Sequence, residues 1–336
     1  MLTPTRGSRQ YAGLVTSVVP GLRGSVLDPG LFSPEAVDPA TVAFNAELAT
    51  RMAGIPPTWS LPPQVTREAR EAGRGAFGPL VLSDMARERS IPTPAGPLTL
   101  RTFVPETVTG VYLFLHGGGW TIGRAHHADV NLEALAKTAN LAVVSVDYRL
   151  APEHPYPAGP DDCEAAAIWL VEHARSEFGT DRLSIGGESA GAHLSVVTLL
   201  RMRDKHGFSG FARANLVYGC YDLAMTPSAR SAPETTLILP PRSIRWFVEQ
   251  FGVADRIQDA DVSPIWGDLR GMPAALFSVG TLDPLVDDSL FMYGRWIAAG
   301  SVAELAIYPG GVHGFNGFPY ALAQQANQKV IDFLRD

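Results

Sequence analysis

The chain has 336 residues, of which 46% are hydrophobic, so it is long and apolar enough to bury one large core or two modest ones without disulfides or metal. Its 27 basic and 34 acidic side chains give a net charge of −7, which provides no basic surface for nucleic acid. The two cysteines, Cys163 and Cys220, show no CxxC spacing and no clustering with histidines, which argues against a disulfide scaffold and a structural zinc site.

An apolar stretch at residues 11–19 follows Arg6 and Arg9, an order typical of secretion signals. Pro20 and Gly21 interrupt this stretch, and no small-residue cleavage site follows it. No apolar run in the chain approaches the roughly 18 residues that a membrane helix needs. We therefore expect a cytoplasmic protein without a membrane segment.

Apolar residues at helical spacing predict a helix over residues 39–53. Asp38 is the expected N-cap, and Pro39 suits the first helical position because the N–H that proline lacks would have no partner there. A proline-rich break follows at residues 56–63. A second helix is expected to start near Thr66, whose hydroxyl can cap it.

From about Arg87 onward, short apolar runs alternate with helical patterns. The β-branched runs are typical of strands that are covered on both faces. The predicted strands lie at 98–104, 111–115, 141–146, 183–186, 214–218, 274–279 and 303–308, and the clearest helices at 130–139, 161–174 and 290–299. This alternation predicts a largely parallel sheet with helices on both faces.

Between Tyr221 and Pro264 the alternation lapses around several prolines and a single predicted helix at 243–251. We interpret this stretch as an insertion at the ligand-binding edge of the sheet.

The segment Gly187–Gly191 reads Gly-Glu-Ser-Ala-Gly and lies between a predicted strand and a predicted helix. A serine nucleophile on such a sharp turn has a strained backbone, and small neighbours prevent clashes. The following helix directs its N-terminal amides at developing negative charge. Ser189 is therefore a candidate nucleophile, although the pattern alone fits a glycine-rich helix start equally well.

A second motif, His-Gly-Gly-Gly-Trp at residues 116–120, directly follows the strand predicted at 111–115. Consecutive glycines expose their backbone N–H groups and let a substrate approach closely. With the amide of Ala190, they would form an oxyanion hole for acyl transfer. A phosphate-binding loop would instead show GK[ST] or GxGxxG before a helix, and neither is present. His116 precedes the nucleophile, so we interpret it as a structural hydrogen-bonding residue rather than a base.

A serine nucleophile needs a general base, which follows it in the chain in this type of fold. His193 lies one turn along the helix after Ser189 and is interpreted as a core or surface residue. His206 lies in a charged run and is expected to be solvated. His313 lies in a glycine-rich loop between the last predicted strand and the final helix, so we assign the base to it.

The base needs an orienting carboxylate, which is expected in the loop after the strand at 274–279. Asp283 comes just past the carboxyl end of that strand, where the ligand sites of such sheets lie. Asp287 and Asp288 fall at the start of the next helix, where acidic residues commonly interact with the helix dipole. Asp283 is favoured over that pair.

Together these motifs resemble the hormone-sensitive-lipase-like family of α/β-hydrolases, in its bacterial esterase branch. Four blocks match in order: His116–Trp120, Asp147–Pro157, Gly187–Gly191, and Asp283–Leu285 with His313–Phe315. Glu188 departs from the family pattern, which more often has Asp or Thr before the serine. The hydrogen bonds behind the nucleophile turn are therefore not predicted.

The resemblance implies an α/β-hydrolase fold with a largely parallel sheet of about eight strands. It implies a Ser189–Asp283–His313 triad, with oxyanion donors from Gly117, Gly118 and Ala190. It also implies a catalytic domain of residues 86–221 and 263–336 under a helical cap made of residues 1–85 and 222–262. Apolar side chains are expected to roof the site, the candidates being Phe44, Leu237, Ile238, Leu239, Trp246 and Phe247.

The combined motifs predict a carboxylesterase that hydrolyses short- to medium-chain acyl esters through an acyl-enzyme intermediate, without a cofactor or metal. The expected partner is a small-molecule ester; no nucleic acid or membrane partner is expected, and a homodimer is left open. An amidase or a lipase with the same triad is an alternative, because triad geometry does not name the leaving group. A non-catalytic small-molecule receptor on the same fold is a further alternative, but it has no need of all three triad residues.

Overall fold

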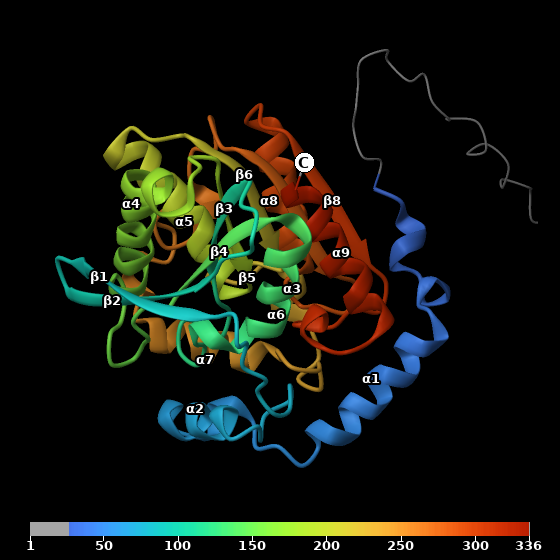
Figure 1. The fold of residues 1–336 in the computed structure, drawn as a ribbon. Coiled ribbons are helices and arrows are strands. Elements are labelled where there is room, and N and C mark those ends of the chain that lie inside the picture. Colours follow the sequence, from blue (N-terminus) through green and yellow to red (C-terminus); the bar gives the residue numbers. More distant parts are fainter. Residues whose placement is uncertain (1–26, 336) are drawn as a thin grey trace, which may run out of the picture.

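The computed structural model describes residues 27–335, so the apolar stretch at residues 11–19 lies outside the described part. Eight strands form one sheet in the order β1-β2-β4-β3-β5-β6-β7-β8 (Figure 1). Strands β3 to β8 run parallel to one another, whereas β2 is antiparallel to both β1 and β4. The strands are β1 (Arg87–Thr93), β2 (Gly96–Phe103), β3 (Gly110–Leu115), β4 (Leu141–Val146), β5 (Leu183–Glu188), β6 (Phe211–Val217), β7 (Ala274–Gly280) and β8 (Ala303–Tyr308).

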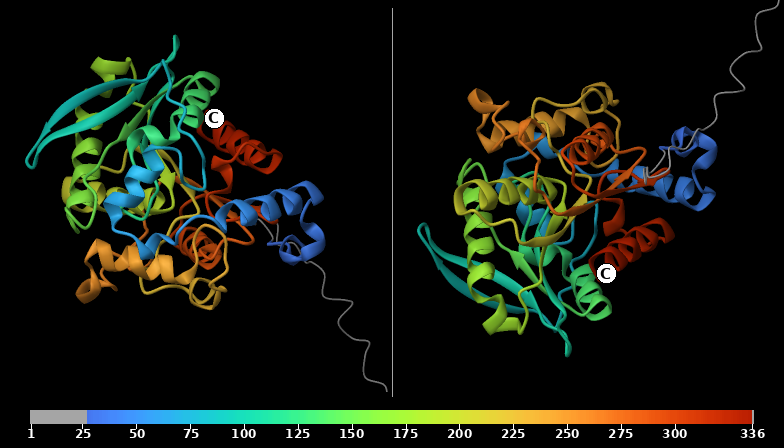
Figure 2. Two further views of the ribbon diagram at one scale, coloured as in Figure 1. Left: turned by 90° about the horizontal axis from the view of Figure 1, so that it is seen from below. Right: turned by 90° about the horizontal axis from the view of Figure 1, so that it is seen from above.

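All seven predicted strands are present, and the sequence analysis missed only the edge strand β1. This strand reads Arg-Glu-Arg-Ser-Ile-Pro-Thr, and Ile91 is its one buried residue. An edge strand with one apolar residue and a proline has neither the alternation nor the apolar run that marks a strand. Figure 2 shows the β1–β2 hairpin (cyan) reaching out at one edge of the molecule.

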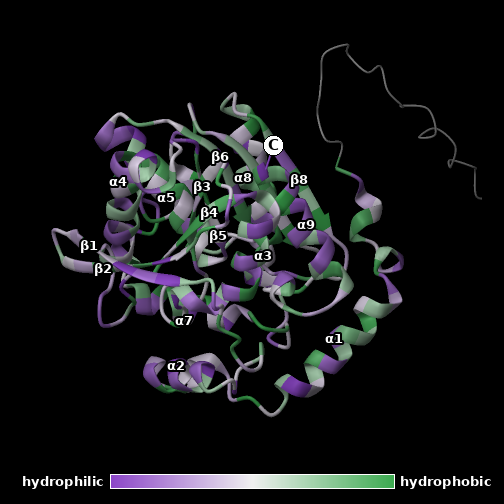
Figure 3. Cartoon of the chain, viewed as in Figure 1, coloured by the Kyte–Doolittle hydropathy of each residue, from purple (hydrophilic) through white to green (hydrophobic). Residues whose placement is uncertain are grey.

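Helices cover both faces of the sheet, as the alternation predicts. Along β3, Val111, Leu113 and Leu115 join one core, whereas Tyr112 and Phe114 join the other. The first core also receives side chains from α4 (Ala158–Phe178), α5 (Ala190–His206) and α8 (Val286–Ala298), and the second from α3 (Asp129–Ala139) and α9 (Ala321–Arg335). In Figure 3 the central strands are mostly apolar, and the polar residues gather on the outer helices. Within residues 27–335, no helix combines the length and apolarity needed to cross a membrane.

Two helices precede the sheet, and the first begins as predicted. Helix α1 (Pro39–Met52) is capped by Asp38, whose carboxylate accepts a hydrogen bond from the Ala40 N–H at 2.8 Å. Helix α2 (Pro63–Glu71) begins before the expected position, with Pro63 in its first turn and no side-chain cap. The expectation that Thr66 caps α2 is wrong, because a proline at the first position starts the helix earlier and places Thr66 inside it.

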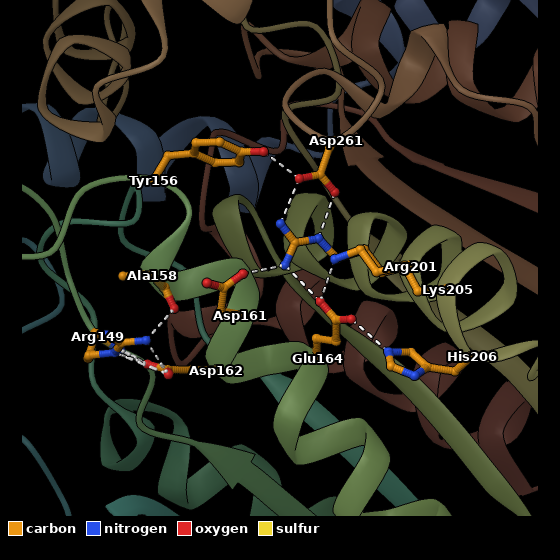
Figure 4. Close-up of polar contacts among 10 residues, drawn as sticks. All are labelled: Arg149, Tyr156, Ala158, Asp161, Asp162, Glu164, Arg201, Lys205, His206 and Asp261. Atoms are coloured by element: carbon orange, nitrogen blue, oxygen red, sulfur yellow. Dashed lines mark hydrogen bonds and ion pairs between the residues drawn. The ribbon is translucent and has the colours of Figure 1, made fainter. Parts of the chain in front are cut away.

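The insertion predicted at residues 222–262 carries two helices, α6 (Pro227–Ser231) and α7 (Pro241–Phe251). Its C-terminal end is fixed to the body of the molecule by Arg201 of α5, whose side chain is almost fully buried (Figure 4). The Arg201 guanidinium donates to both carboxylate oxygens of Asp261 at 2.6 Å, and to Asp161 and Glu164 of α4 at 2.8 and 2.9 Å. Three carboxylates thus surround one cation, which compensates for its burial.

His206 belongs to the same group of charges. Its Nε2 lies 2.7 Å from Oε1 of Glu164, and Lys205 donates to the other oxygen of that carboxylate at 2.9 Å (Figure 4). His206 is exposed to solvent, as expected, and its imidazole also pairs with α4. The charged run in which it lies faces carboxylates on α4, and this pairing between helices is not visible in the local sequence.

The N-terminal end of the insertion is fixed by Asp288 in the first turn of α8. Its fully buried carboxylate accepts hydrogen bonds from the backbone N–H groups of Tyr221 and Asp222, at 2.6 and 3.0 Å, and from the Thr226 hydroxyl at 2.6 Å. Asp288 therefore does more than interact with the helix dipole. Burial raises its pKa from 3.8 to about 7, against the opposing effect of these donors.

Asp288→Asn should remove a pH-dependent loss of stability. The folded pKa of Asp288 lies above its unfolded value, so folding stability falls as the pH rises from about 4 to about 7. The loss above pH 7 is on the order of 4 kcal/mol. An asparagine keeps the acceptor for both N–H groups and does not ionise, so its variant should gain relative to wild type between pH 5 and pH 8. Urea unfolding of the variant and of wild type at pH 5 and at pH 8 measures this gain. If the free energies of unfolding of the two proteins differed by the same amount at both pH values, the prediction would be contradicted.

Candidate active site

Ser189 lies at the turn between β5 and α5, the nucleophile turn. Its backbone has φ 55° and ψ −120°, a conformation that residues other than glycine rarely adopt. Its N–H donates to the Val217 carbonyl at 2.9 Å, and its own carbonyl accepts from the His193 N–H at 3.1 Å. A side chain at Gly187 or Gly191 would place its Cβ 2.1 or 1.8 Å from the Leu115 carbonyl oxygen. Both flanking glycines are therefore required by the close approach of this turn to the end of β3.

The structure brings the three predicted side chains together in one line. Nε2 of His313 lies 2.9 Å from Oγ of Ser189, and Nδ1 of His313 lies 2.8 Å from Oδ2 of Asp283. The second oxygen of Asp283 accepts a hydrogen bond from the Leu285 N–H at 2.9 Å. Asp283 is 2% exposed and His313 is 7% exposed, so bulk water scarcely competes for these contacts.

A glycine pair lets the loops after β7 and β8 meet. A Cβ on Gly280 would lie 2.1 Å from the Gly311 carbonyl oxygen, so only glycine permits this approach. The Leu282 N–H donates to that same Gly311 carbonyl at 3.0 Å. These contacts hold the Asp283 and His313 loops side by side.

The loop after β3, His116–Trp120, is here called the glycine loop, and it exposes backbone N–H groups. Gly118 and Gly119 have φ values of 114° and 57°, which are accessible to glycine. No described residue accepts a hydrogen bond from the N–H of Gly117, Gly118 or Ala190. Ala190 is the first residue of α5, where an N–H has no partner within the helix. These three groups are the predicted oxyanion donors.

His116 acts on the glycine loop, as the sequence analysis expected. Its Nδ1 donates to the Gly117 carbonyl at 2.9 Å, and its ring stacks on Tyr148 with 4.0 Å between centroids. Burial lowers the pKa of His116 to about 4, so the ring is neutral at physiological pH. Because a carbonyl and the next N–H point in opposite directions across a trans peptide, this bond sets the direction of the Gly118 N–H.

His193 is a core residue, the first of the two interpretations left open for it. It is fully buried, donates from Nε2 to the Val262 carbonyl at 2.7 Å, and accepts from the Trp120 indole N–H at 3.1 Å. It therefore links the glycine loop to the end of the insertion.

The hydrogen bonds behind the nucleophile turn involve Asn316, a residue that the sequence analysis missed. Its Nδ2 donates to Oε1 of Glu188 at 2.7 Å, and its Oδ1 accepts from the Tyr218 hydroxyl. Burial raises the pKa of Glu188 above its usual 4.5. The only sign of this role in the sequence is that Asn316 follows His313 by three residues. A short helical turn there brings the Asn316 side chain back to the nucleophile turn.

Ser189 and His313 open into a cavity of about 1240 Å³. The insertion contributes Leu237, Ile238, Leu239 and Phe247 to its lining, and the N-terminal segment contributes residues between Ala49 and Val81. Two expected roof residues do not line it: Phe44 stacks on Tyr320 and Trp246 packs edge-on against Phe247. A Cβ on Gly119 would overlap the Phe247 ring, at 2.2 Å, so the insertion rests directly on the glycine loop.

One group of side chains in the described residues has ligand atoms close enough for a metal. Glu71, His126 and His127 place such atoms within 4.8 Å of one another. Both imidazoles lie within hydrogen-bond distance of Glu71, with Nε2 to carboxylate distances of 3.0 and 2.9 Å. Hydrogen bonding between these side chains accounts for the cluster.

The comparisons with curated proteins find ester hydrolases. The chain is 35% identical over 248 residues to the carboxylic ester hydrolase LipN of Mycobacterium tuberculosis, an alignment that covers 71% of this chain and 66% of LipN. It is 36% identical over 236 residues to the carboxylesterase NlhH of the same species, covering 66% of this chain and 72% of NlhH. An acetyl esterase of Salmonella schwarzengrund is 30% identical over 237 residues, with coverage of 68% and 72%.

Solved structures agree with these relatives. The hyperthermophilic esterase of the archaeon Pyrobaculum calidifontis superposes with a TM-score of 0.79 at 27% identity, covering 89% of this chain and 98% of that one. A hormone-sensitive lipase from a metagenome library gives 0.77 at 26% identity, with the same coverage. The alpha/beta hydrolase fold family matches residues 112–317. By its sheet, its motifs and these relatives, the chain belongs to the α/β hydrolase fold family, in the hormone-sensitive-lipase-like branch.

Proposed function

We propose that this carboxylic ester hydrolase uses Ser189 as its nucleophile, His313 as its general base and Asp283 as the carboxylate that orients the base. The hydrogen-bonded line from Asp283 through His313 to Ser189 carries the proposal. Oγ of Ser189 attacks the ester carbonyl while Nε2 of His313 takes the hydroxyl proton. His313 then gives that proton to the departing alcohol, and water hydrolyses the acyl-enzyme with the same base.

The oxyanion is held by the backbone N–H groups of Gly117, Gly118 and Ala190. These donors have no partner among the described residues, so they need not break a hydrogen bond as charge develops. Asp283 stabilises the imidazolium that forms when His313 is protonated. No step requires a metal or an organic cofactor.

We assign residues 1–85 and 222–262 to the cap and the remaining residues, 86–221 and 263–336, to the catalytic domain; residues 1–26 and 336 lie outside the described part of the chain. Two contacts within the described residues support this division. Asn45 of α1 donates to the Gly310 carbonyl in the His313 loop at 2.9 Å. Arg67 of α2 donates to the Thr121 and Ala151 carbonyls, both at 2.7 Å. Figure 2 shows α1 extending away from the sheet on the side of α9.

The partner is a small-molecule ester, the cytoplasm remains our prediction for the location, and a monomer and a homodimer are both open for the assembly. Fractionation of cells and light scattering of the purified protein test these two. A receptor that only binds its ligand would not need the full line of three side chains. Hydrolysis of an ester in parallel with its anilide distinguishes an esterase from an amidase.

Ser189→Ala should abolish ester hydrolysis and leave the fold intact, because the turn already accommodates small residues. The expected loss in kcat is about 10⁴-fold or more. Hydrolysis of p-nitrophenyl butyrate measures the loss, and circular dichroism checks the fold. Substantial turnover by a folded variant would show that another residue is the nucleophile.

Asp283→Asn should lower kcat severely with a modest change in KM, because the carboxylate acts on the imidazole rather than on bound substrate. Asp287→Asn is the matched control. Asp287 of α8 accepts a hydrogen bond at 2.8 Å from the N–H of Ser228, which lies in the insertion, and not from His313. Steady-state kinetics of both variants decide between the two carboxylates. If Asp287→Asn were the more damaging change, the assignment of Asp283 would be wrong.

Acyl-chain length should matter because the site is a covered apolar cavity. Each methylene buried there contributes roughly 0.8 kcal/mol until the cavity is filled. We expect kcat/KM to peak at about four to eight acyl carbons and to decline toward palmitate. A series of p-nitrophenyl esters measures this profile. A flat profile, or a rate that rises sharply when the substrate forms an emulsion, would contradict a closed esterase pocket.

A further inference from the structure

Two arginines on α2 differ in their polar contacts. Arg67 and Arg70 are three residues apart, so they lie near one another on the helix surface. The Arg67 guanidinium is fully engaged: it donates to the Thr121 and Ala151 carbonyls and makes a two-pronged ion pair with Glu153 at 2.8 Å. Arg70 lies within the cavity that holds Ser189 and His313 and forms no hydrogen bond or ion pair with any described residue.

Arg70 is half-buried. Its Nε is buried without a partner, and burial lowers the pKa of its guanidinium. Its guanidinium carbon lies 5.4 Å from the centroid of the Phe77 ring, a cation–π contact. A guanidinium has five N–H donors in a planar fork, and the buried Nε of Arg70 donates to no described residue. Such a group is costly to withdraw from water unless something in the cavity binds it.

The nearby carboxylates already have other partners. Glu188 accepts a hydrogen bond from Asn316 at 2.7 Å, and Glu71 is shared by His126 and His127. Both influence Arg70 electrostatically without forming an ion pair with it. The other charged side chains that line the cavity, Glu68, Arg74 and Glu234, are solvent-exposed. Among the described residues that line this cavity, Arg70 is thus the half-buried cation without an ion-pair partner.

Arg70 lies near groups that contact the proposed catalytic residues. Its charge acts on Glu188, which precedes the nucleophile, and on Tyr218, whose ring lies 4.8 Å from that of His313. Arg70, Ser189 and His313 line the same cavity, so one ligand can reach Arg70 while its carbonyl lies at Ser189. A planar carboxylate matches the guanidinium fork with two parallel hydrogen bonds.

We propose that Arg70 binds a carboxylate on the substrate, so that the enzyme prefers esters carrying a free carboxylate a short chain away from the scissile bond. This inference rests on the proposed esterase function and specifies its substrate class. The carboxylate can belong to the acyl part, as in a hemiester of a dicarboxylic acid, or to the alcohol part, as in an acetylated hydroxy acid. Both present the same chemistry to Arg70.

Matched pairs of small esters test the proposal in a pH-stat at pH 7.5. For the acyl side, monoethyl glutarate is compared with ethyl 5-methylhexanoate, in which an isopropyl group replaces the carboxylate. For the alcohol side, 4-acetoxybutyrate is compared with 4-methylpentyl acetate. Wild type should favour the anionic member of at least one pair, and that pair identifies the side of the substrate that carries the charge.

Arg70→Gln should lower kcat/KM for the preferred anionic ester by about 10- to 100-fold, the range expected for a hydrogen bond to a charged group. Its kcat/KM for the neutral partner should change less than about threefold. Arg51→Gln is the control, because Arg51 lies on α1 outside the cavity and pairs with Glu47. Arg70→Met should also show an unchanged or higher melting temperature, since it removes a shielded charge that the fold does not pair.

The possible outcomes separate this inference from the proposed function. Failure of wild type to hydrolyse any of the four esters or p-nitrophenyl butyrate would reject the esterase function itself. Good hydrolysis with no anionic preference would overturn the role of Arg70 alone. Equal losses on anionic and neutral esters in Arg70→Gln would also overturn it, because Arg70 would then support the nucleophile turn. A large drop in melting temperature in Arg70→Met would assign Arg70 to the fold.

Discussion

The active site depends on how closely the nucleophile turn packs against the end of β3. The Leu115 carbonyl occupies the space that a side chain at Gly187 or Gly191 would need. This contact places the glycine loop beside Ser189, because that loop begins directly after Leu115. The strained φ of 55° at Ser189 is kept by the same packing and by the bond from its N–H to Val217. The proposed nucleophile and the proposed oxyanion donors are thus parts of one arrangement built on the sheet.

Most of the sheet could be predicted from the sequence, because buried parallel strands are continuous apolar runs and their helices are regularly spaced. The order Ser, Asp, His and the carboxyl ends of strands were enough to nominate three residues that the structure then brings within hydrogen-bond distance. The failures have different causes. Edge strand β1 has too few apolar residues to show a strand pattern, although it pairs with its neighbour in the chain, β2. The partner of His206 and the contacts of Asn316 with Glu188 and Tyr218 depend on segments far apart in the chain, which local patterns do not record.

Two arginines that are withdrawn from water, the buried Arg201 and the half-buried Arg70, differ in what surrounds them. Arg201 is surrounded by three carboxylates, and its network joins α4, α5 and the end of the insertion (Figure 4). Arg70 has no such partners among the described residues, and it faces the cavity rather than an interface between elements. A protein interior tolerates a charge when other groups match it. The contrast separates a charge that the fold itself neutralises from one whose match comes with the ligand.

The two ends of the insertion are both fixed by carboxylates, the fully buried Asp288 at the start and the half-buried Asp261 at the finish. A segment held at both ends on the same rigid body cannot swing about a single hinge. The insertion therefore forms a standing wall of the cavity, and Phe247 rests on Gly119 as part of that wall. Its side chains set part of the shape of the cavity. To change the range of substrates, one would therefore replace side chains of α7 such as Phe247, because each replacement alters the volume of the cavity beside the glycine loop.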